Sequence, residues 1–180
     1  MVYRATLPAV LAAALAFGTV PALAATTNET TKPDVTDFQR AKITLDQAIA
    51  AAQKESGGNA IDANFLKMNG KTGYAVSVLA DNQIKGLWVD PQSGQATPET
   101  RLTTAELNQQ SLDKADLSGV HNEKATLAQA IAMAEQHSGG KAIDAGVAMH
   151  NDSVAYNVQT VLNGKLSTTW VNPATGQIIS

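Results

Sequence analysis

The chain changes its hydrophobic period in the same order twice. Apolar residues first recur every three or four positions, at Leu45, Ala48, Ile49 and Ala52, which predicts an amphipathic helix. Apolar and polar residues then alternate, which predicts strands. The same order of periods returns after residue 124. The sequence therefore predicts two units, each with one helix followed by strands.

The two units are copies of one another. They align without a gap when Lys42 is placed on Lys124, and identical residues then coincide along the whole unit. In both copies a Thr and a Gln stand three residues apart where the helix begins, as Thr44 and Gln47 do, which is the spacing of a capping box. A Gly pair ends each helix, because glycine adopts the left-handed conformation at low cost. The self-similarity indicates a duplication.

Short polar turns divide each strand region into hairpins. Asn69-Gly70, Asn151-Asp152 and Asn163-Gly164 predict tight turns, and Asp81-Asn82 is a weaker counterpart. A short last strand is predicted from Gln177 to Ser180, after a Pro-x-x-Gly turn.

The alternation also assigns side chains to the two faces of the strands. Tyr156, Val158 and Thr160 are predicted to point inward, toward the helix. The same alternation, followed along the next strand, predicts that Trp88 and Trp170 lie inward beneath the helices.

These elements predict an α+β fold of two repeated units, each with one N-terminal helix packed on a 3-4-stranded antiparallel sheet. The copies span 42–97 and 124–180. A unit of about 56 residues is marginally stable by itself, so we expect the two copies to pack together. They form either two small domains or one pseudo-symmetric domain.

The first residues predict export from the cytoplasm. Residues 1–24 combine a short basic start, an apolar run and the small-residue end Ala22-Leu23-Ala24, which predicts a signal peptide cleaved after Ala24. An uncleaved membrane anchor is the alternative, and it is disfavoured because an alanine-rich run is weakly hydrophobic.

Two polar segments flank the first copy. Residues 25–41 are rich in Thr and are predicted to be a flexible lead-in. Residues 98–123 are predicted to be a polar linker, in which Thr103–Leu112 is a candidate short helix.

Charge and composition exclude several classes of protein. The chain has 13 Lys and Arg against 16 Asp and Glu, a net charge of −3, and no Cys. Without Cys there is no disulfide scaffold, Cys-based zinc site, thiol nucleophile or lipidated N-terminal Cys. An acidic chain without a basic cluster argues against nucleic-acid binding, which needs a positive surface. No second apolar run approaches the roughly 20 residues that span a bilayer.

The sequence offers no catalytic set, and we predict that the protein is not an enzyme. It contains no His-Glu-x-x-His, no Gly-x-Ser-x-Gly and no phosphate-binding Gly loop. Ser56 and Ser138 precede the Gly pairs, where the end of a helix explains them better than a nucleophile does.

The three histidines are best interpreted as solvated surface residues. His137 ends the second helix and His121 precedes that helix, so these two are too far apart to share an ion. His121 and His150 could approach one another, which leaves a weak transition-metal site as the alternative.

Acidic residues are the candidates for a hard-cation site. Asp62 and Asp144 occupy matched positions and are predicted to point away from the core. A strand-start or edge charge explains them without a ligand, whereas a hard cation needs several oxygens within about 2.6 Å. No calcium-loop motif is present, so a site would be assembled from distant segments. The candidate ligands are Asp62, Asp144, Asp81, Asp90, Asp113 and Asp116.

The matched aromatic residues also allow two interpretations. Trp88, Trp170, Tyr74 and Tyr156 could form an aromatic ligand-binding surface, but matched positions of inward parity favour a core role.

Several of these features together resemble the PepSY domain, here in tandem. Both copies have a helix that opens Thr-Leu-x-Gln-Ala-Ile-Ala, a Gly stop, a Tyr-x-Val strand and a Trp-Val-Asp/Asn-Pro-x-Ser/Thr-Gly turn. The turn is the most specific piece, and the second copy departs from it with Asn in place of Asp. Its residues are Trp88, Asp90, Pro91 and Gly94 in the first copy and Trp170, Asn172, Pro173 and Gly176 in the second.

The resemblance implies a cystatin-like fold and a turn that is structural rather than catalytic. PepSY units occur in propeptides of secreted thermolysin-type metallopeptidases, as inhibitors or folding aids, and in free exported proteins, some of them linked to metal binding. We therefore expect a periplasmic or secreted, non-enzymatic protein that binds an extracytoplasmic partner such as a peptidase through an exposed sheet face or edge. The alternative is a protein of the same compartment that binds a divalent or trivalent hard cation through carboxylates. No other cofactor, no nucleic acid and no membrane span after signal removal are expected.

Overall fold

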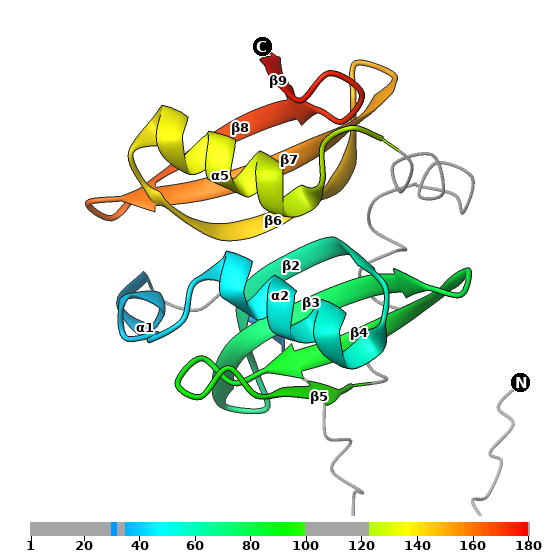
Figure 1. The fold of residues 1–180 in the computed structure, drawn as a ribbon. Coiled ribbons are helices and arrows are strands. Elements are labelled where there is room, and N and C mark those ends of the chain that lie inside the picture. Colours follow the sequence, from blue (N-terminus) through cyan, green and yellow to red (C-terminus); the bar gives the residue numbers. More distant parts are fainter. Residues whose placement is uncertain (1–29, 32–34, 100–122, 180) are drawn as a thin grey trace, which may run out of the picture.

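The computed structural model describes residues 30–31, 35–99 and 123–179. The predicted signal peptide and the candidate helix Thr103–Leu112 lie outside the described residues. The first copy consists of α2 (Leu45–Ser56), β2 (Asn59–Met68), β3 (Lys71–Ala80), β4 (Gln83–Val89) and β5 (Ala96–Pro98). The second consists of α5 (Leu127–Ser138), β6 (Lys141–His150), β7 (Ser153–Leu162), β8 (Lys165–Asn172) and β9 (Gln177–Ile179). The short elements β1 (Thr30–Thr31) and α1 (Val35–Gln39) precede them (Figure 1).

The strands of both copies join into one sheet. Its order is β5-β4-β3-β2-β6-β7-β8-β9, and β1 pairs with the end of β2. The central strands β2 and β6 are antiparallel, and Ala63 lies opposite Ala145. These two alanines occupy the same position in the two copies, so a pseudo-two-fold axis passes through this pair. The duplication has therefore produced one pseudo-symmetric domain rather than two separate ones.

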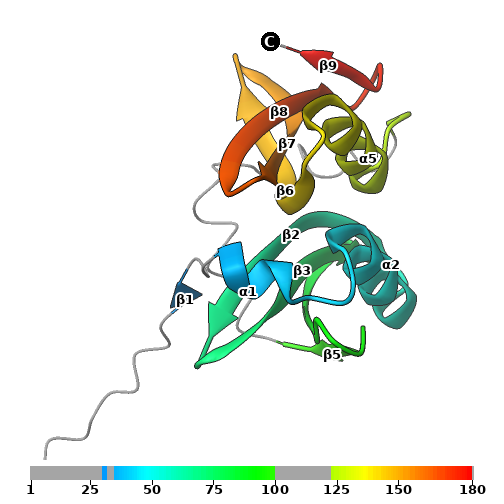
Figure 2. The ribbon, with the colours of Figure 1, turned by 90° about the vertical axis from the view of Figure 1, so that its left-hand side faces the viewer.

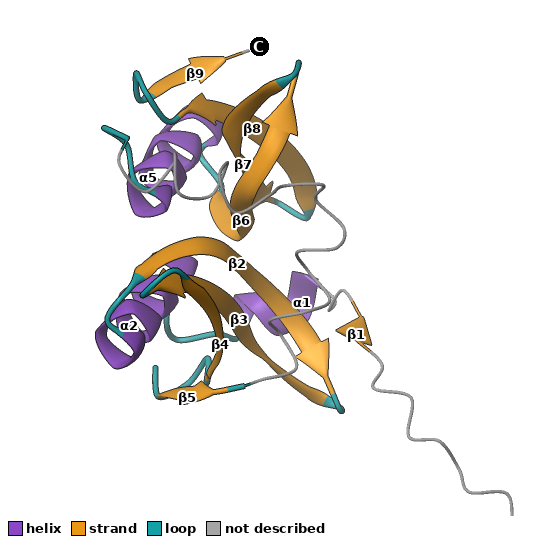
Figure 3. Cartoon of the chain, turned by 90° about the vertical axis from the view of Figure 1, so that its right-hand side faces the viewer, coloured by secondary structure: helices purple, strands orange, loops and turns teal. Residues whose placement is uncertain are grey.

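Both long helices cover the same face of this sheet, as Figures 2 and 3 show from opposite sides. The pseudo-two-fold axis is perpendicular to the sheet. The rotation that relates the two copies therefore keeps α2 and α5 on the same side of the sheet. Leu45, Ile49, Leu127 and Ile131 are almost fully buried and belong to a single apolar core that extends through both copies. The core is the main source of stability, because burial of apolar surface dominates folding.

The helix termini confirm the capping signals. The Gln47 N–H donates to Thr44 Oγ1 at 3.3 Å, and the Thr44 N–H donates to Gln47 Oε1 at 3.0 Å. The same reciprocal pair closes the start of α5. Gly57 and Gly139 end the helices with φ of +74° and +70°, so the Ser-Gly-Gly segments are helix stops.

A β-bulge in each copy separates the start of the first long strand from the rest. The pairing of β2 with β3 shifts between Ala60 and Asp62, and that of β6 with β7 shifts between Ala142 and Asp144. The extra residue of the bulge changes which face the following side chains occupy. Ala60 and Ile61 are therefore both in the core, and so are Ala142 and Ile143. After the bulge the alternation is regular, so Asp62 and Asp144 lie on the face opposite the helices, as predicted.

The prediction that both tryptophans point inward is wrong. Trp88 lies opposite Ala75 and Trp170 lies opposite Asn157, so both share the face opposite Tyr74 and Tyr156. Leu87, Trp88 and Val89 form a continuous apolar run, in which alternation alone cannot choose the buried positions. The two-residue turn before β4 pairs Ala80 with Gln83, and this pairing fixes which side chains of β4 point to each face of the sheet.

The lead-in also differs from the prediction of a flexible segment. Part of it forms β1 and α1, and Phe38 of α1 is buried. Its ring meets Phe65 edge to face at 5.4 Å between centroids, and Phe65 meets Tyr74 at 5.0 Å. The buried Phe38 ring therefore anchors α1 to the core, although most other residues of α1 are polar.

Candidate functional site: the helix-free face

The turn shared with the PepSY motif ties the last part of each copy to the start of its helix. The carbonyl oxygen of Pro91 accepts hydrogen bonds from the N–H groups of Lys42 at 2.9 Å and Ile43 at 3.3 Å. The Tyr74 hydroxyl donates to the Ile43 carbonyl oxygen at 2.6 Å. In the second copy, Ala125 takes the place of Ile43: its N–H donates to the Pro173 carbonyl oxygen at 3.0 Å, and the Tyr156 hydroxyl donates to the Ala125 carbonyl oxygen at 2.9 Å.

Burial of the two tyrosines affects their ionisation. Desolvation raises the pKa of Tyr74 far above its ordinary value. Desolvation, with a smaller contribution from the Glu123 carboxylate, raises the pKa of Tyr156 to about 12. Both hydroxyls are therefore neutral donors at physiological pH and serve the fold.

The carboxylate of Asp90 is used within its own turn. Its Oδ1 accepts from the backbone N–H of Gln92 at 2.9 Å and of Ser93 at 2.8 Å, and from the Ser93 hydroxyl at 2.9 Å. The hydrogen bonds from Ser93, reinforced by Gln92, lower the pKa of Asp90. Asn172 replaces it in the second copy and accepts from the Thr175 N–H at 3.0 Å. Gly94 and Gly176 complete the two turns with positive φ.

The structure does not bring the predicted acidic ligands together at one point. Asp81 lies at the tip of the β3–β4 hairpin, 3.9 Å from the ammonium group of Lys85. Asp113 and Asp116 lie outside the described residues. Among the residues that the structure describes, no group of three His, Cys, Asp or Glu side chains is arranged to hold a metal ion.

Asp62 and Asp144 do lie close to one another. Asp62 is opposite Gly146 and Asn64 is opposite Asp144, so the two acids are diagonal neighbours on adjacent central strands. Diagonal positions are separated by about 7–8 Å. The interpretation of these acids as edge charges is therefore wrong, because β2 and β6 are the middle strands of the sheet.

The surroundings of Asp62 are close-packed. The side chain is 7% exposed, and one of its oxygens accepts a hydrogen bond from the Asn64 amide. A Cβ at Gly146 would collide with the other oxygen. Glycine at this position therefore makes room for the carboxylate, which is a reason for the difference between Gly146 and its counterpart Asn64.

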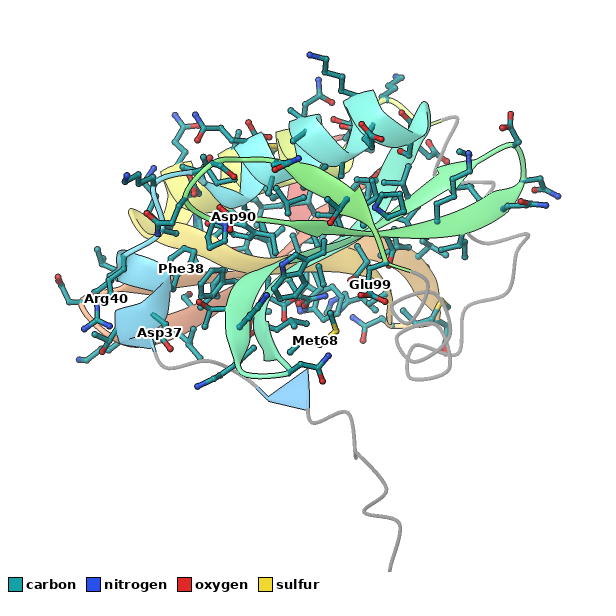
Figure 4. The ribbon with its side chains drawn as sticks, turned by 90° about the horizontal axis from the view of Figure 1, so that it is seen from below. Asp37, Phe38, Arg40, Met68, Asp90 and Glu99 are labelled. Atoms are coloured by element: carbon teal, nitrogen blue, oxygen red, sulfur yellow. The ribbon has the colours of Figure 1, made fainter. Side chains whose placement is uncertain are left out.

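We call the surface opposite α2 and α5 the helix-free face. In the first copy it carries Trp88, which packs on the buried residues Leu66, Met68 and Ala75. The indole lies directly over Gly73, where a Cβ would meet its ring atoms. Figure 4 shows Met68 and Glu99 on this side of the sheet, away from α2.

The second copy has a more polar arrangement on the same face. Trp170 is half-buried and stacks on the imidazole ring of His150, with ring centroids 4.5 Å apart and planes tilted by 31°. Nε2 of the His150 ring lies 3.2 Å from Nδ2 of the Asn151 side chain. His121, proposed as a partner for His150, lies outside the described residues, and His137 is exposed at the end of α5.

The two copies differ at almost every strand position of the helix-free face. Leu66, Met68, Ala75 and Ser77 correspond to Ala148, His150, Asn157 and Gln159. Only the Asp62/Asp144 pair and the Trp88/Trp170 pair are identical among the strand positions on this face. Sequence reasoning missed this because it placed the tryptophans in the core. The length of the hairpin turns could have revealed the position of the tryptophans. A two-residue turn determines which residues of the following strand point to each face of the sheet.

A search of curated proteins finds no match. A solved structure from Clostridium difficile 630, described as a "putative lipoprotein", aligns with 16% sequence identity over 79% of this chain and 93% of that chain, with a TM-score of 0.39. Within the described ranges, no helix is both long and apolar enough to cross a membrane.

The family comparison covers both copies. Residues 42–97 and 124–180 each match PepSY, the "Peptidase propeptide and YPEB domain" family. These ranges contain α2 to β4 with most of β5, and α5 to β9, together with the turns that fasten each helix to its sheet. The chain belongs to the PepSY family and carries two PepSY domains in tandem.

Proposed function

We propose that this tandem PepSY protein is an exported, non-catalytic binding protein that docks an extracytoplasmic protein partner on the helix-free face. A peptidase that it inhibits or helps to fold is the leading candidate, because the family description includes peptidase propeptides. One observation carries the proposal. On the helix-free face, one Asp and one Trp are identical in the two copies, whereas the residues at the other strand positions differ.

The residues of the family motif support a non-catalytic role. Asp90 and Pro91 use their polar atoms within the turn or on the start of the helix. The tyrosines likewise use their hydroxyls on the backbone. These side chains stabilise the scaffold, and the half-buried tryptophans on the opposite side are the groups suited to contact a partner, since aromatic residues are enriched at interfaces.

The proposal is tested with the exported form of the protein, whose N-terminus should be Ala25 by mass measurement. Immobilised protein is used to capture exported proteins, and the activity of captured and purified extracytoplasmic peptidases is assayed as the protein is added. We expect a peptidase whose activity changes with a saturating dose. The Trp88→Leu/Trp170→Leu variant should lose this effect.

A matched control removes apolar surface elsewhere. Leu162 and Ile178 are 46% and 39% exposed. Leu162 has the strand parity of Val158 and Ile178 lies opposite the core residue Val171, so neither belongs to the helix-free face. The Leu162→Ala/Ile178→Ala variant should behave as wild type. Equal activity with both variants, or no effect of the protein on any exported peptidase, contradicts the proposal.

Binding of a hard cation is the alternative function, and the proximity of Asp62 and Asp144 is the observation in its favour. Calorimetric titration with calcium and with a trivalent ion distinguishes the two functions. Saturable heat at micromolar ion that disappears in Asp62→Asn/Asp144→Asn supports the cation. Absence of such heat leaves the protein partner as the ligand of this face.

A further inference from the structure

β9 covers only part of the outer edge of β8. It is the shorter strand of the two, and it pairs with Trp170, Val171 and Asn172 (Figure 1). Among the described residues, no strand pairs with the outer side of β8 from Lys165 to Thr169. An unpaired row of backbone N–H and C=O groups is a template for another strand. We call this five-residue segment the β8 edge and treat it as a candidate interaction surface.

The hairpin turn before β8 determines which backbone groups point outward. The turn has two residues, both with positive φ, so the flanking Leu162 and Lys165 are a hydrogen-bonded pair. Hydrogen-bonded and non-hydrogen-bonded pairs alternate along antiparallel strands. The N–H and C=O groups of Leu166 and Thr168 therefore point away from β7 and toward the open side.

The corresponding edge of the first copy is covered further along its strand. Gly86 is the counterpart of Thr168, and its carbonyl oxygen accepts a hydrogen bond from the Glu99 N–H at 2.8 Å, one position beyond β5. This bond shows that the backbone at the matched position does point outward. Pro98 of β5 also offers no N–H to a further strand. Gly86 is buried, whereas every residue from Lys165 to Thr168 is exposed, so the two ends of the sheet differ.

The β8 edge is complementary to itself. Its five residues are centred on Ser167, and the hairpin turn bounds them on one side and β9 on the other. When two such edges pair antiparallel with Ser167 facing Ser167, Leu166 of each molecule lies opposite Thr168 of the other. The outward N–H and C=O groups of these residues then all have partners. Other antiparallel registers leave some of these groups unpaired or overlap β9.

The side chains of the edge favour the same pairing. Leu166 is 58% exposed, more than any other large apolar residue in the described ranges. In the symmetric pair, the two Leu166 side chains are diagonal neighbours on the helix-free face, and each is also diagonal to Trp170 of the other molecule. Each exposed leucine is thereby covered by apolar surface, which is favourable. The two Lys165 side chains are four positions out of step, about 14 Å apart, so their charges do not meet.

A pairing of this kind already joins the two halves of the molecule. At the centre of the sheet, Ala63 of β2 faces its own counterpart Ala145 of β6 across the pseudo-two-fold axis. Pairing at the β8 edge repeats this operation between molecules, with the helices of both on one side and the two helix-free faces joined on the other. Because a two-fold contact uses the same edge of both molecules, it closes at two rather than growing into a fibre.

We infer that two molecules of this protein associate through their β8 edges into a two-fold dimer with one continuous sheet. The inference goes beyond the proposed function and does not depend on it. A five-residue edge buries less surface than a stable interface does, so we expect a dissociation constant of roughly 100 μM.

Sedimentation equilibrium of the full exported protein, from about 10 μM to about 1 mM, measures the association. The dimer fraction should rise with concentration, and no larger species should form. Thr168→Pro should raise the dissociation constant at least about tenfold, because proline lacks the outward N–H and is tolerated on an edge strand. Leu166→Lys should have a similar effect, because the two added charges become diagonal neighbours.

A matched control places the same charge on the other face of the hairpin. Leu162→Lys adds a lysine at an exposed position that has the strand parity of Val158, and it should leave the dissociation constant unchanged. Circular dichroism and thermal unfolding check that each variant folds.

Single cysteines test the register independently of the affinity. The chain contains no Cys, so Ser167→Cys gives each molecule one thiol. Directly opposite residues of a non-hydrogen-bonded pair have Cα atoms about 4.5 Å apart, a distance that a disulfide spans. Lys165→Cys is the control, since its two thiols would lie on Cα atoms about 14 Å apart. Under mild oxidation, Ser167→Cys should form disulfide-linked dimers at least about tenfold faster than Lys165→Cys.

Several results would overturn the inference. One is a monomer at every concentration, with equal rates of crosslinking in the two cysteine variants. Association that Thr168→Pro leaves unchanged would place the contact elsewhere, and species larger than a dimer would exclude two-fold closure. If the protein remains monomeric and Thr168→Pro abolishes its effect on a captured peptidase, the occupant of the edge is a strand of the partner. Dimerisation without any effect on a peptidase supports this inference and contradicts the proposed function.

Discussion

Beneath the helices, the two copies place the same residue at most positions, with exceptions such as Phe65 and Val147, whereas on the other face of the sheet they differ at almost every position. Leu45, Ile49, Tyr74 and Val76 recur as Leu127, Ile131, Tyr156 and Val158, and all are buried. On the helix-free face, Met68 beside one tryptophan corresponds to His150 beside the other. The shared side is constrained by close packing, which tolerates little change in volume. The helix-free face is packed differently in the two copies, because Trp88 rests on buried apolar residues whereas Trp170 stacks on His150. The Asp and Trp that persist there do so although their neighbours have changed.

The largest expected effect tests whether the copies form one cooperative unit. Ile49→Ala and Ile131→Ala should each lower the free energy of unfolding by about 3 kcal/mol, because each leaves a cavity in the shared core. Urea unfolding is followed by circular dichroism and by the fluorescence of Trp88→Phe and Trp170→Phe versions, which report one copy each. Both probes should give a single coincident transition.

The control for the core variants is Glu55→Ala, an exposed change on α2 that should alter the free energy of unfolding by less than about 0.5 kcal/mol. Two separate transitions, with only the altered copy destabilised, would contradict the single core.

The next prediction tests whether the two tryptophans pack against the sheet in the same way. Gly73→Ala should lower the free energy of unfolding by about 1–3 kcal/mol and shift the emission of Trp88, since a Cβ there collides with the indole. The matched change Ala155→Gly in the second copy should cost no more than about 1 kcal/mol, the usual penalty for glycine in a strand. Equal emission shifts in both variants would show that the two indoles are supported alike.

The tyrosines provide a comparison that depends on pH. Tyr74→Phe and Tyr156→Phe should each lower the free energy of unfolding by about 1–2 kcal/mol, because a buried carbonyl loses its donor. The pKa of Tyr156 is about 12 when folded and 10.0 when unperturbed. The unfolded chain therefore ionises first, and stability falls between these two pH values.

Unfolding experiments across this alkaline range check the assignment to Tyr156. The Tyr156→Phe variant should lack the part of the loss that ionisation of this hydroxyl causes. An unchanged alkaline profile in that variant would place the loss elsewhere.

The smallest effect concerns the two Pro turns. Asp90→Asn should lower the free energy of unfolding at pH 7 by at most about 1 kcal/mol, and Asn172→Asp should raise it by a similar amount. The pKa of Asp90 is lowered in the folded protein, so its contribution is present above the unfolded pKa of about 3.9 and is lost as pH falls through the folded pKa. Unfolding at pH 7 and pH 2.5 should show the difference at pH 7 alone. A difference that persists in acid would mean that the charge is not its source.

The acids of the helix-free face show where sequence reasoning reached a limit. The alternation of β2 and β6 indicated that Asp62 and Asp144 point away from the core, and they do. Their proximity depends on the pairing of β2 with β6, two strands far apart in the chain. No local pattern specifies such a pairing, because its energy comes from contacts between the copies.

The sequence by itself determined the duplication, the helices with their caps and stops, the hairpin turns and the PepSY family, because each depends on residues close together along the chain. Only the tertiary structure decided that the copies share one sheet and one core, that α1 adds Phe38 to that core, and that the tryptophans lie opposite the helices. These features depend on strand register and on packing between distant segments. Register follows from turn geometry and from the whole set of buried contacts, so a short apolar run such as Leu87-Trp88-Val89 fits either face until the sheet is assembled.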